Sequence, residues 1–307
     1  MRRGHPRAVI VAFSLLVAMA VLSVPLAGAR TTAASTHGMF ATIDCPGASH
    51  TVVLGVNDLG AMVGVCGSGP HGFIDRGGQF TTVNYPGAST GFAGGVNDLG
   101  VIVGAYANSD GVYHGFIDRG GQFTTIDDAN AGTGPGLGTF PQGVNNLGEV
   151  TGVYFDSSGN VHGFTYLHGT FTTIDVLGAT ATFLAHPNDA GAVAGVSFDS
   201  SGSAYSFVLQ RGVWTTINDP VAPPGQTYGA SVNDLGTVVG NYNDSSGLSH
   251  GFLERGGHYT TFDDPYAGTD GSQGQGTVPN ANNNLGLIVG SYQDSSNVTH
   301  GFAFTGY

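Results

Sequence analysis

The chain has 307 residues, of which 53 are glycine, and its formal net charge at pH 7 is −13 although only 9% of its residues are charged. This composition excludes a charged disordered chain and favours tightly turned β-structure over helices. All basic residues apart from histidine are arginines, and an acidic surface repels phosphate backbones and anionic lipids. We therefore expect neither nucleic acid nor a membrane surface as a partner.

The first element in chain order is typical of a secretory signal peptide. Arg2, Arg3 and Arg7 precede a nearly continuous apolar run over residues 8–26, and Ala27-Gly28-Ala29 supplies small residues for cleavage. The sequence therefore predicts export.

This segment sets the expected domain organisation. We predict a signal peptide at 1–29, a short linker at 30–36 and a single domain at 37–307, which is secreted, periplasmic or held in the cell envelope without membrane insertion after cleavage. The alternative is an uncleaved membrane anchor, although Ser14 and Pro25 interrupt the apolar run.

Three short motifs then recur along the chain. A turn motif of the type Val-Asn-Asp-Leu-Gly occurs six times, and a His-Gly-Phe motif and an aromatic-Thr-Thr-aliphatic-Asp motif follow it in most copies. The asparagines of the turn motif are Asn57, Asn97, Asn145, Asn188, Asn233 and Asn283. Short apolar runs separated by Asn, Asp and Gly are the signature of strands joined in hairpins. Four strands per repeat of about 45 residues is the spacing of a propeller blade.

The last copy of the third motif is displaced to the front of the domain. The chain ends at Tyr307 after the third strand of the last repeat, and residues 40–44 match the missing fourth strand. We predict an all-β fold, a six-bladed β-propeller of four-stranded antiparallel blades that is closed by the N-terminal strand completing the last blade. The alternative is an open solenoid, which would need polar capping repeats that the sequence does not show.

The recurring Val-Asn-x-x-Gly-x-x-x-Gly and His-Gly-Phe motifs resemble the HAF-type extracellular repeats of bacterial secreted proteins, over nearly the whole mature chain. The His-Ala-Phe that names this family is His-Gly-Phe here. The resemblance implies export and a repeat architecture. It implies no particular activity, because that family is defined by its repeat.

The histidines of the His-Gly-Phe motif are predicted to be structural. With a two-residue turn at Gly120-Gly121, the flanking strands pair so that His114 lies opposite Asp127. The same register gives the pairs His162–Asp175, His250–Asp263 and His300–Asp44, and His71 opposite Asn84 in the first repeat. A pair that recurs in most repeats favours a cross-strand lock. The alternative is a ring-shaped metal site.

Loops of the type Asp-Ser-Ser-Gly, such as residues 156–159, suggest calcium at first sight. They lack the alternating acidic ligands and the bidentate Glu of strong calcium loops, and hairpin turns prefer the same residues. We predict no metal and no cofactor.

Loop length varies on one face of the predicted ring. The connectors between repeats are long at 127–142, 218–228 and 263–280. Long loops on a rigid scaffold usually contain the binding residues. The candidate ligand-binding residues depart from the repeat and are His186, Asp128, Asp219, Tyr228, Asp264, Tyr266 and Asp270. The alternative for each is a solvated loop residue without a binding role.

The two cysteines, Cys45 and Cys66, are expected near the same face of the ring. An exported protein can form a disulfide between them, which would fasten the ring closure. Two buried free thiols are the alternative.

These observations favour a monomeric, non-catalytic binding protein that recognises an extracellular glycan, peptide or protein through its loop-rich face. We assign no catalytic residue, because no nucleophile motif, phosphate-binding loop or zinc spacing occurs. The alternative is a glycoside hydrolase or polysaccharide lyase with its site at the channel mouth, which rests on fold analogy alone. A third possibility is a structural protein of the cell envelope.

Overall fold

The structure of the chain is a computed structural model that describes residues 32–35, 38–67, 71–270 and 274–306. All regular elements of these residues are β-strands, so the fold is all-β. The signal peptide expected at 1–29 lies outside the described residues. A membrane-spanning helix is not found in the described part of the chain.

Most strands form consecutive groups of four in which each strand pairs antiparallel with the next. The groups are β3–β6 (Thr51–Val56, Ala61–Cys66, His71–Arg76, Gln79–Val83), β7–β10 (Thr90–Val96, Val101–Ala107, Tyr113–Arg119, Gln122–Ile126), β11–β14 (Gly138–Val144, Val150–Phe155, Val161–Leu167, Thr170–Ile174), β15–β18 (Ala181–Pro187, Ala192–Phe198, Ala204–Gln210, Val213–Ile217) and β19–β22 (Thr227–Val232, Val238–Asn243, Ser249–Arg255, His258–Phe262). The short Asn-, Asp- and Gly-rich turns fix this hairpin order.

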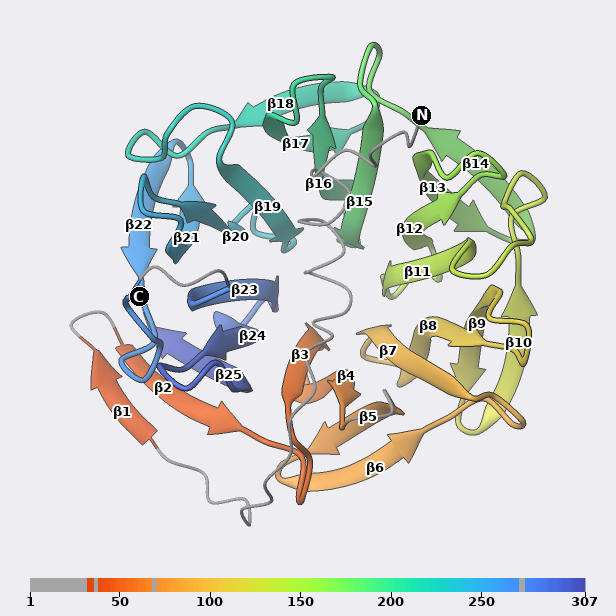
Figure 1. Cartoon of the computed structure of the whole chain (residues 1–307), viewed down its shortest axis with the longest axis horizontal. Helices are drawn as coiled ribbons and strands as arrows, with labels where there is room; N and C mark the ends of the chain where they lie inside the picture. Colours follow the sequence, from red (N-terminus) through yellow and green to blue (C-terminus); the bar gives the residue numbers. More distant parts are fainter. Residues whose placement is uncertain (1–31, 36–37, 68–70, 271–273, 307) are drawn as a thin grey trace, which may run out of the picture.

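The last group joins both ends of the described chain. It consists of β23 (Gly276–Asn282), β24 (Leu287–Gln293) and β25 (Thr299–Gly306), and β2 (Gly38–Ile43) pairs antiparallel with β25 along its whole length. Figure 1 shows the two segments side by side. The strand β1 (Thr32–Ser35) pairs with the free edge of β2, so the segment expected to be a linker at 30–36 contains a strand.

The groups are arranged around a common centre (Figure 1). The first strand of each group (β3, β7, β11, β15, β19 and β23) lies innermost. Single parallel bridges, such as Val161 to Ala181, connect neighbouring groups into a 21-stranded sheet, whereas β3–β6 form a separate four-stranded sheet. Ladder hydrogen bonds therefore do not run around the whole molecule. Side-chain packing joins β3–β6 to the groups on either side.

The phenylalanines of the His-Gly-Phe motif form the core between neighbouring groups. Each is at most 2% exposed: Phe73, Phe116, Phe164, Phe252 and Phe302. The glycine beside them has a steric reason, because a Cβ on Gly115 would lie 2.6 Å from the carbonyl oxygen of Ile126. This close approach of strands explains the glycine at this position of the motif.

The asparagines of the turn motif link the innermost strands. Each side-chain Nδ2 donates to the carbonyl of the corresponding asparagine in the next group at 2.9–3.0 Å, and the series ends where it begins, with Asn283 donating to Asn57. In addition Oδ1 of Asn57 accepts from the N–H of Ala61. Both ends of this buried amide are thus satisfied. The series of six such amides positions the turns relative to the central axis.

Candidate functional site

The innermost strands share a β-bulge at one repeat position. The register shifts fall at Val53/Gly55, Ala93/Gly95, Pro141/Gly143, Leu184/Pro187, Gly229/Ser231 and Pro279/Ala281. A bulge re-aims a side chain and is often found next to a functional site. Five bulged residues line one axial cavity: Leu54, Gln142, Ala185, Ala230 and Asn280.

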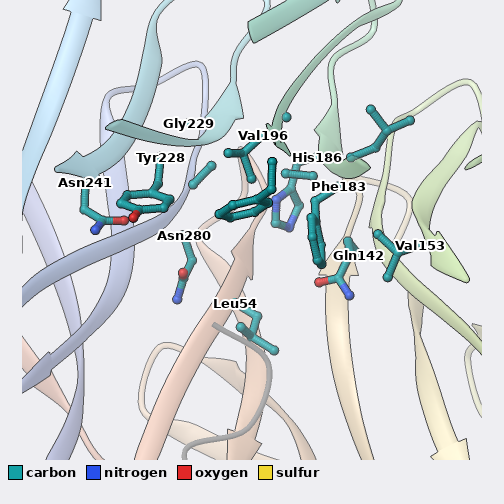
Figure 2. Close-up of a pocket in the computed structure, with 15 residues that line it drawn as sticks. Leu54, Gln142, Val153, Phe183, His186, Val196, Tyr228, Gly229, Asn241 and Asn280 are labelled. Carbon is teal, nitrogen blue, oxygen red and sulfur yellow. The ribbon is translucent and has the colours of Figure 1, made fainter. Parts of the chain in front are cut away.

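This cavity has a volume of about 80 Å³ and an aromatic wall. The wall consists of Phe183, Phe198 and Tyr228. The ring centroids of Phe183 and Phe198 are 5.8 Å apart, and those of Phe198 and Tyr228 are 6.4 Å apart. Phe183 is only partly buried, so its ring remains available for contact with a ligand (Figure 2).

Uncharged polar groups lie opposite and beside this wall. Gln142, Asn241 and Asn280 place amides around the cavity (Figure 2). The Nδ2 of Asn280 donates to the Val53 carbonyl at 2.8 Å, which holds this side chain in place between β23 and β3. None of the described residues that line the cavity is acidic. The arrangement therefore suits an uncharged ligand that offers both an apolar face and hydroxyl or amide groups.

His186 lies at the turn end of the cavity. Its position in the other five repeats holds a small residue: Gly55, Gly95, Gly143, Ser231 and Ala281. The Nε2–H of His186 donates to the Gly94 carbonyl of β7 at 3.2 Å, which leaves Nδ1 as an acceptor without a hydrogen-bond partner. Burial lowers the pKa of His186 more than the nearby carbonyls of Gly94 and Ala230 raise it. A neutral imidazole thus separates the cavity from the axial mouth on the other face, which it also lines.

The acidic connector residues expected to bind ligand lie elsewhere. Asp128, Asp219 and Asp264 are at most 5% exposed and are not among the residues that line the cavity. In each, Oδ1 accepts from the backbone N–H two residues later, and Oδ2 has no hydrogen-bond partner. They therefore shape their own connectors in the manner of Asx turns.

Burial also perturbs two of these carboxyl groups. It raises the pKa of Asp264 to about 6, and it raises the pKa of Asp219. Of the other candidates, Tyr228 lines the cavity, whereas Tyr266 and Asp270 do not. Tyr266 is 45% exposed, and the backbone N–H of Asp270 donates to Gln275.

The His–Asp pairs lie on the loop-rich face. Nδ1 of the histidine and Oδ2 of the aspartate are 2.8–2.9 Å apart in His114–Asp127, His162–Asp175, His250–Asp263 and His300–Asp44. In three of them a second aspartate approaches Nε2 at 3.5–3.6 Å: Asp156, Asp244 and Asp294. These second aspartates begin the Asp-Ser-Ser loops, so each histidine ties a loop to a strand end.

In two of these pairs the carboxylate also raises the pKa of the histidine. Hydrogen bonding to Asp263 raises the pKa of His250, and hydrogen bonding to Asp44 raises the pKa of His300. Tyr242 and Tyr292 stack on these rings at centroid distances of 5.1 and 5.0 Å. The described residues contain no group of three or more His, Cys, Asp or Glu placed to hold a metal ion.

Cys45 and Cys66 are joined by a disulfide with Cα atoms 6.3 Å apart. Cys45 follows β2 and Cys66 ends β4. The bond therefore links the last strand group to the first.

Comparison with known proteins adds information on the fold only. The sequence matches no family model and no curated protein. Among solved structures, TolB from Acinetobacter baumannii aligns with a TM-score of 0.50 and 12% identity, over 89% of this chain and 78% of TolB. Two further structures score lower. The six-bladed β-propeller lectin of Aleuria aurantia has a TM-score of 0.46 at 12% identity over 89% of both chains. AofleA from Arthrobotrys oligospora has 0.48 at 11% identity over 84% of this chain and 81% of its own. Scores below 0.5 carry no functional meaning for this chain.

Sequence reasoning missed most residues of the cavity, including Gln142, Asn280 and Phe183. The first two occupy the position three residues before the motif asparagine, where the other repeats have Leu54, Gly94, Ala185 and Ala230. An amide occurs at this position only in these two repeats. The change from an apolar or small residue to an amide at this position is the sequence signal that could have identified the cavity.

Proposed function

We propose that the chain is an exported, six-bladed β-propeller that binds an uncharged glycan at its axial cavity without acting on it. The observation that carries the proposal is the composition of the cavity, which combines aromatic rings with amide groups and has no carboxylate among its described lining residues.

Two sets of contacts support the proposed architecture. The antiparallel pairing of β2 with β25 completes the last strand group, and the series of asparagine hydrogen bonds passes through all six turns before it returns to Asn57. Closure of the ring in this way covers the strand edge that β25 would otherwise expose. It also brings the six bulged positions of the innermost strands to a single axis.

The ligand class follows from the chemistry of the wall. The face of Phe183, which is only partly buried, can pack against the apolar face of a pyranose ring, while Gln142 and Asn241 can exchange hydrogen bonds with its hydroxyl groups. A charged sugar would lose its hydration at this site without gaining a counter-ion. We expect the terminal residue of a glycan to enter the cavity and the connectors to contact the rest of the glycan.

Polysaccharide cleavage finds no support in this cavity. Glycoside hydrolysis generally needs two carboxyl groups on either side of the scissile bond. The buried acids Asp128, Asp219 and Asp264 each hold a connector turn instead. We therefore favour binding over catalysis.

Isothermal titration with a panel of neutral oligosaccharides tests the proposal. For a neutral glycan that binds the wild-type protein, Phe183→Ala should weaken binding about tenfold and Gln142→Ala about fivefold. Gln122→Ala provides a matched control, because Gln122 is exposed on the outer strand β10. Absence of binding across the panel, or equal loss of affinity in the Gln122 control, would contradict the proposal.

A further inference from the structure

The face opposite the long connectors carries an unusual set of leucines. This turn face consists of the turns between the first and second strands of each group and those between the third and fourth. The leucine of the Asn-Asp-Leu-Gly type turn is 62–77% exposed in five repeats: Leu59, Leu99, Leu147, Leu235 and Leu285. Single exposed leucines are normal, but large apolar side chains gathered on one face mark an interaction site.

Inside the leucines, polar side chains surround the axial mouth. The backbone N–H of each residue donates to Oδ1 of the next at 2.7–2.8 Å around a ring of Asp58, Asp98, Asn146, Asp189, Asp234 and Asn284. The Nδ2 of Asn146 also donates to Asp98 and Asp189, and that of Asn284 donates to Asp58 and Asp234. The donors of this ring are uncharged, so four negative charges remain at the mouth.

A buried acceptor also lines this mouth. Asn282 stands where the other repeats have Val or Pro, and it is 8% exposed. Its Nδ2 donates to the Thr237 carbonyl, whereas its Oδ1 has no hydrogen-bond partner. A buried acceptor without a donor is costly. Together with the four carboxylates, it favours a ligand that is both cationic and a hydrogen-bond donor.

We propose that the turn face docks a polypeptide partner through a lysine or arginine side chain that enters this mouth. The leucines pack against apolar residues on either side of the cation. Leu59 and Asp98 line one cavity together with Arg76, so the leucine adjoins both the acidic ring and an arginine of the outer turn. This site is independent of glycan binding, which involves the cavity on the other side of His186.

Other occupants fit less well. Exposed arginines lie on the outer turns of the same face, namely Arg76, Arg119, Arg211 and Arg255, and they would attract an anionic membrane. A membrane would, however, bring four carboxylates against lipid phosphates. A second copy stacked on the same axis would set one acidic ring against another. Acidic residues of a polypeptide partner can instead pair with the arginines at the rim.

The test uses two capped peptides, acetyl-Ser-Leu-Lys-Leu-Ser-amide and its Gln-for-Lys counterpart, titrated calorimetrically into the full chain. We expect the lysine peptide to bind about tenfold more tightly than the glutamine peptide, with an affinity that falls as salt is added. Equal affinity for both peptides, or no heat from the lysine peptide at millimolar concentration, would overturn the proposal.

Matched variants locate the contact. Leu59→Ala/Leu99→Ala/Leu285→Ala should weaken lysine-peptide binding about fivefold, and Ala190 already occupies this position in the fourth repeat, which makes the variant compatible with the fold. Leu177→Ala is the control, because Leu177 is fully exposed on a connector of the opposite face. If the triple variant binds the lysine peptide as tightly as the wild type does, the proposal is wrong. The proposal is also wrong if the wild-type protein is retained on phosphatidylcholine–phosphatidylglycerol vesicles and the triple variant is not.

Discussion

From the His–Asp pairs we predict that the free energy of unfolding falls as the pH rises above neutrality. In the neutral state with Nδ1 protonated, His250 would direct its Nε2 lone pair at the carboxylate of Asp244, 3.5 Å away. Protonation replaces this repulsion with a second attractive contact. The pKa values of His250 and His300 are accordingly raised in the folded state by their carboxylate partners.

The direction of the stability change with pH follows from the difference between the folded and unfolded pKa values. A histidine whose folded pKa exceeds its unfolded value contributes stability that is complete below the unfolded pKa, about 6.5, and that is lost as the pH rises through the folded pKa. Hydrogen bonds to charged groups contribute about 1.5–3 kcal/mol. The side chain of Asp263 is 44% exposed, and solvent screening reduces the contribution to about 1 kcal/mol per histidine. The two histidines together should therefore lower the free energy of unfolding by about 2 kcal/mol between about pH 6 and pH 9.

Urea unfolding followed by tryptophan fluorescence at a series of pH values measures this loss. In His250→Gln/His300→Gln the side chains keep a donor for the aspartate but cannot take up a proton, so the decline over this range should flatten. His71→Gln is the control, since His71 lies opposite Asn84 and has no carboxylate partner there. The same decline in the double variant and the wild type would refute this reasoning.

Three further predictions concern other parts of the chain. Asp264→Asn should raise the free energy of unfolding at pH 7 by about 2 kcal/mol, because burial raises the folded pKa of this carboxyl to about 6. The variant should also lose part of the decline in unfolding free energy that the wild type shows as the pH rises from about 4 to about 6. A variant less stable than the wild type at pH 7 would contradict this. Reduction of the Cys45–Cys66 disulfide should cost about 3 kcal/mol in the same assay, and an unchanged unfolding midpoint would argue against a stabilising role. Asn145→Ala should cost about 2–3 kcal/mol, because it leaves the Asn188 carbonyl and the Glu149 N–H without their donor and acceptor; an exposed amide control, Gln122→Ala, should cost less than about 0.5 kcal/mol.

Local sequence rules predicted the strand order and the hairpin registers. The Gly120-Gly121 turn fixes the pairing of Gln122 with Arg119, and counting from that turn places His114 opposite Asp127. Such predictions succeed because a short turn allows only one register. The same counting cannot place Gln142 or Asn280, because a bulge adds a residue and turns the side chain to a new direction.

The burial of the acidic connector residues was also beyond the sequence pattern. Asp128 and Asp264 follow another acidic residue in a long polar connector, which resembles a solvated binding loop. The threonine that accepts their backbone N–H lies 11 or 13 residues further along the chain, and this contact depends on the path of the whole connector. His186, in contrast, was recognisable because it interrupts a row of small residues at a position where the strands meet at the axis.

The pairing of β2 with β25 supports ring closure and, through it, the axial cavity, so a cross-link between these strands is the most direct test. Met39 and Thr305 are paired residues, and both are exposed. In Met39→Cys/Thr305→Cys, mild oxidation followed by proteolysis and mass spectrometry should yield a disulfide-linked peptide pair from the two ends of the chain, whereas Met39→Cys/Val213→Cys should not. Failure of the first pair to cross-link, or equal cross-linking of both pairs, would contradict a closed ring.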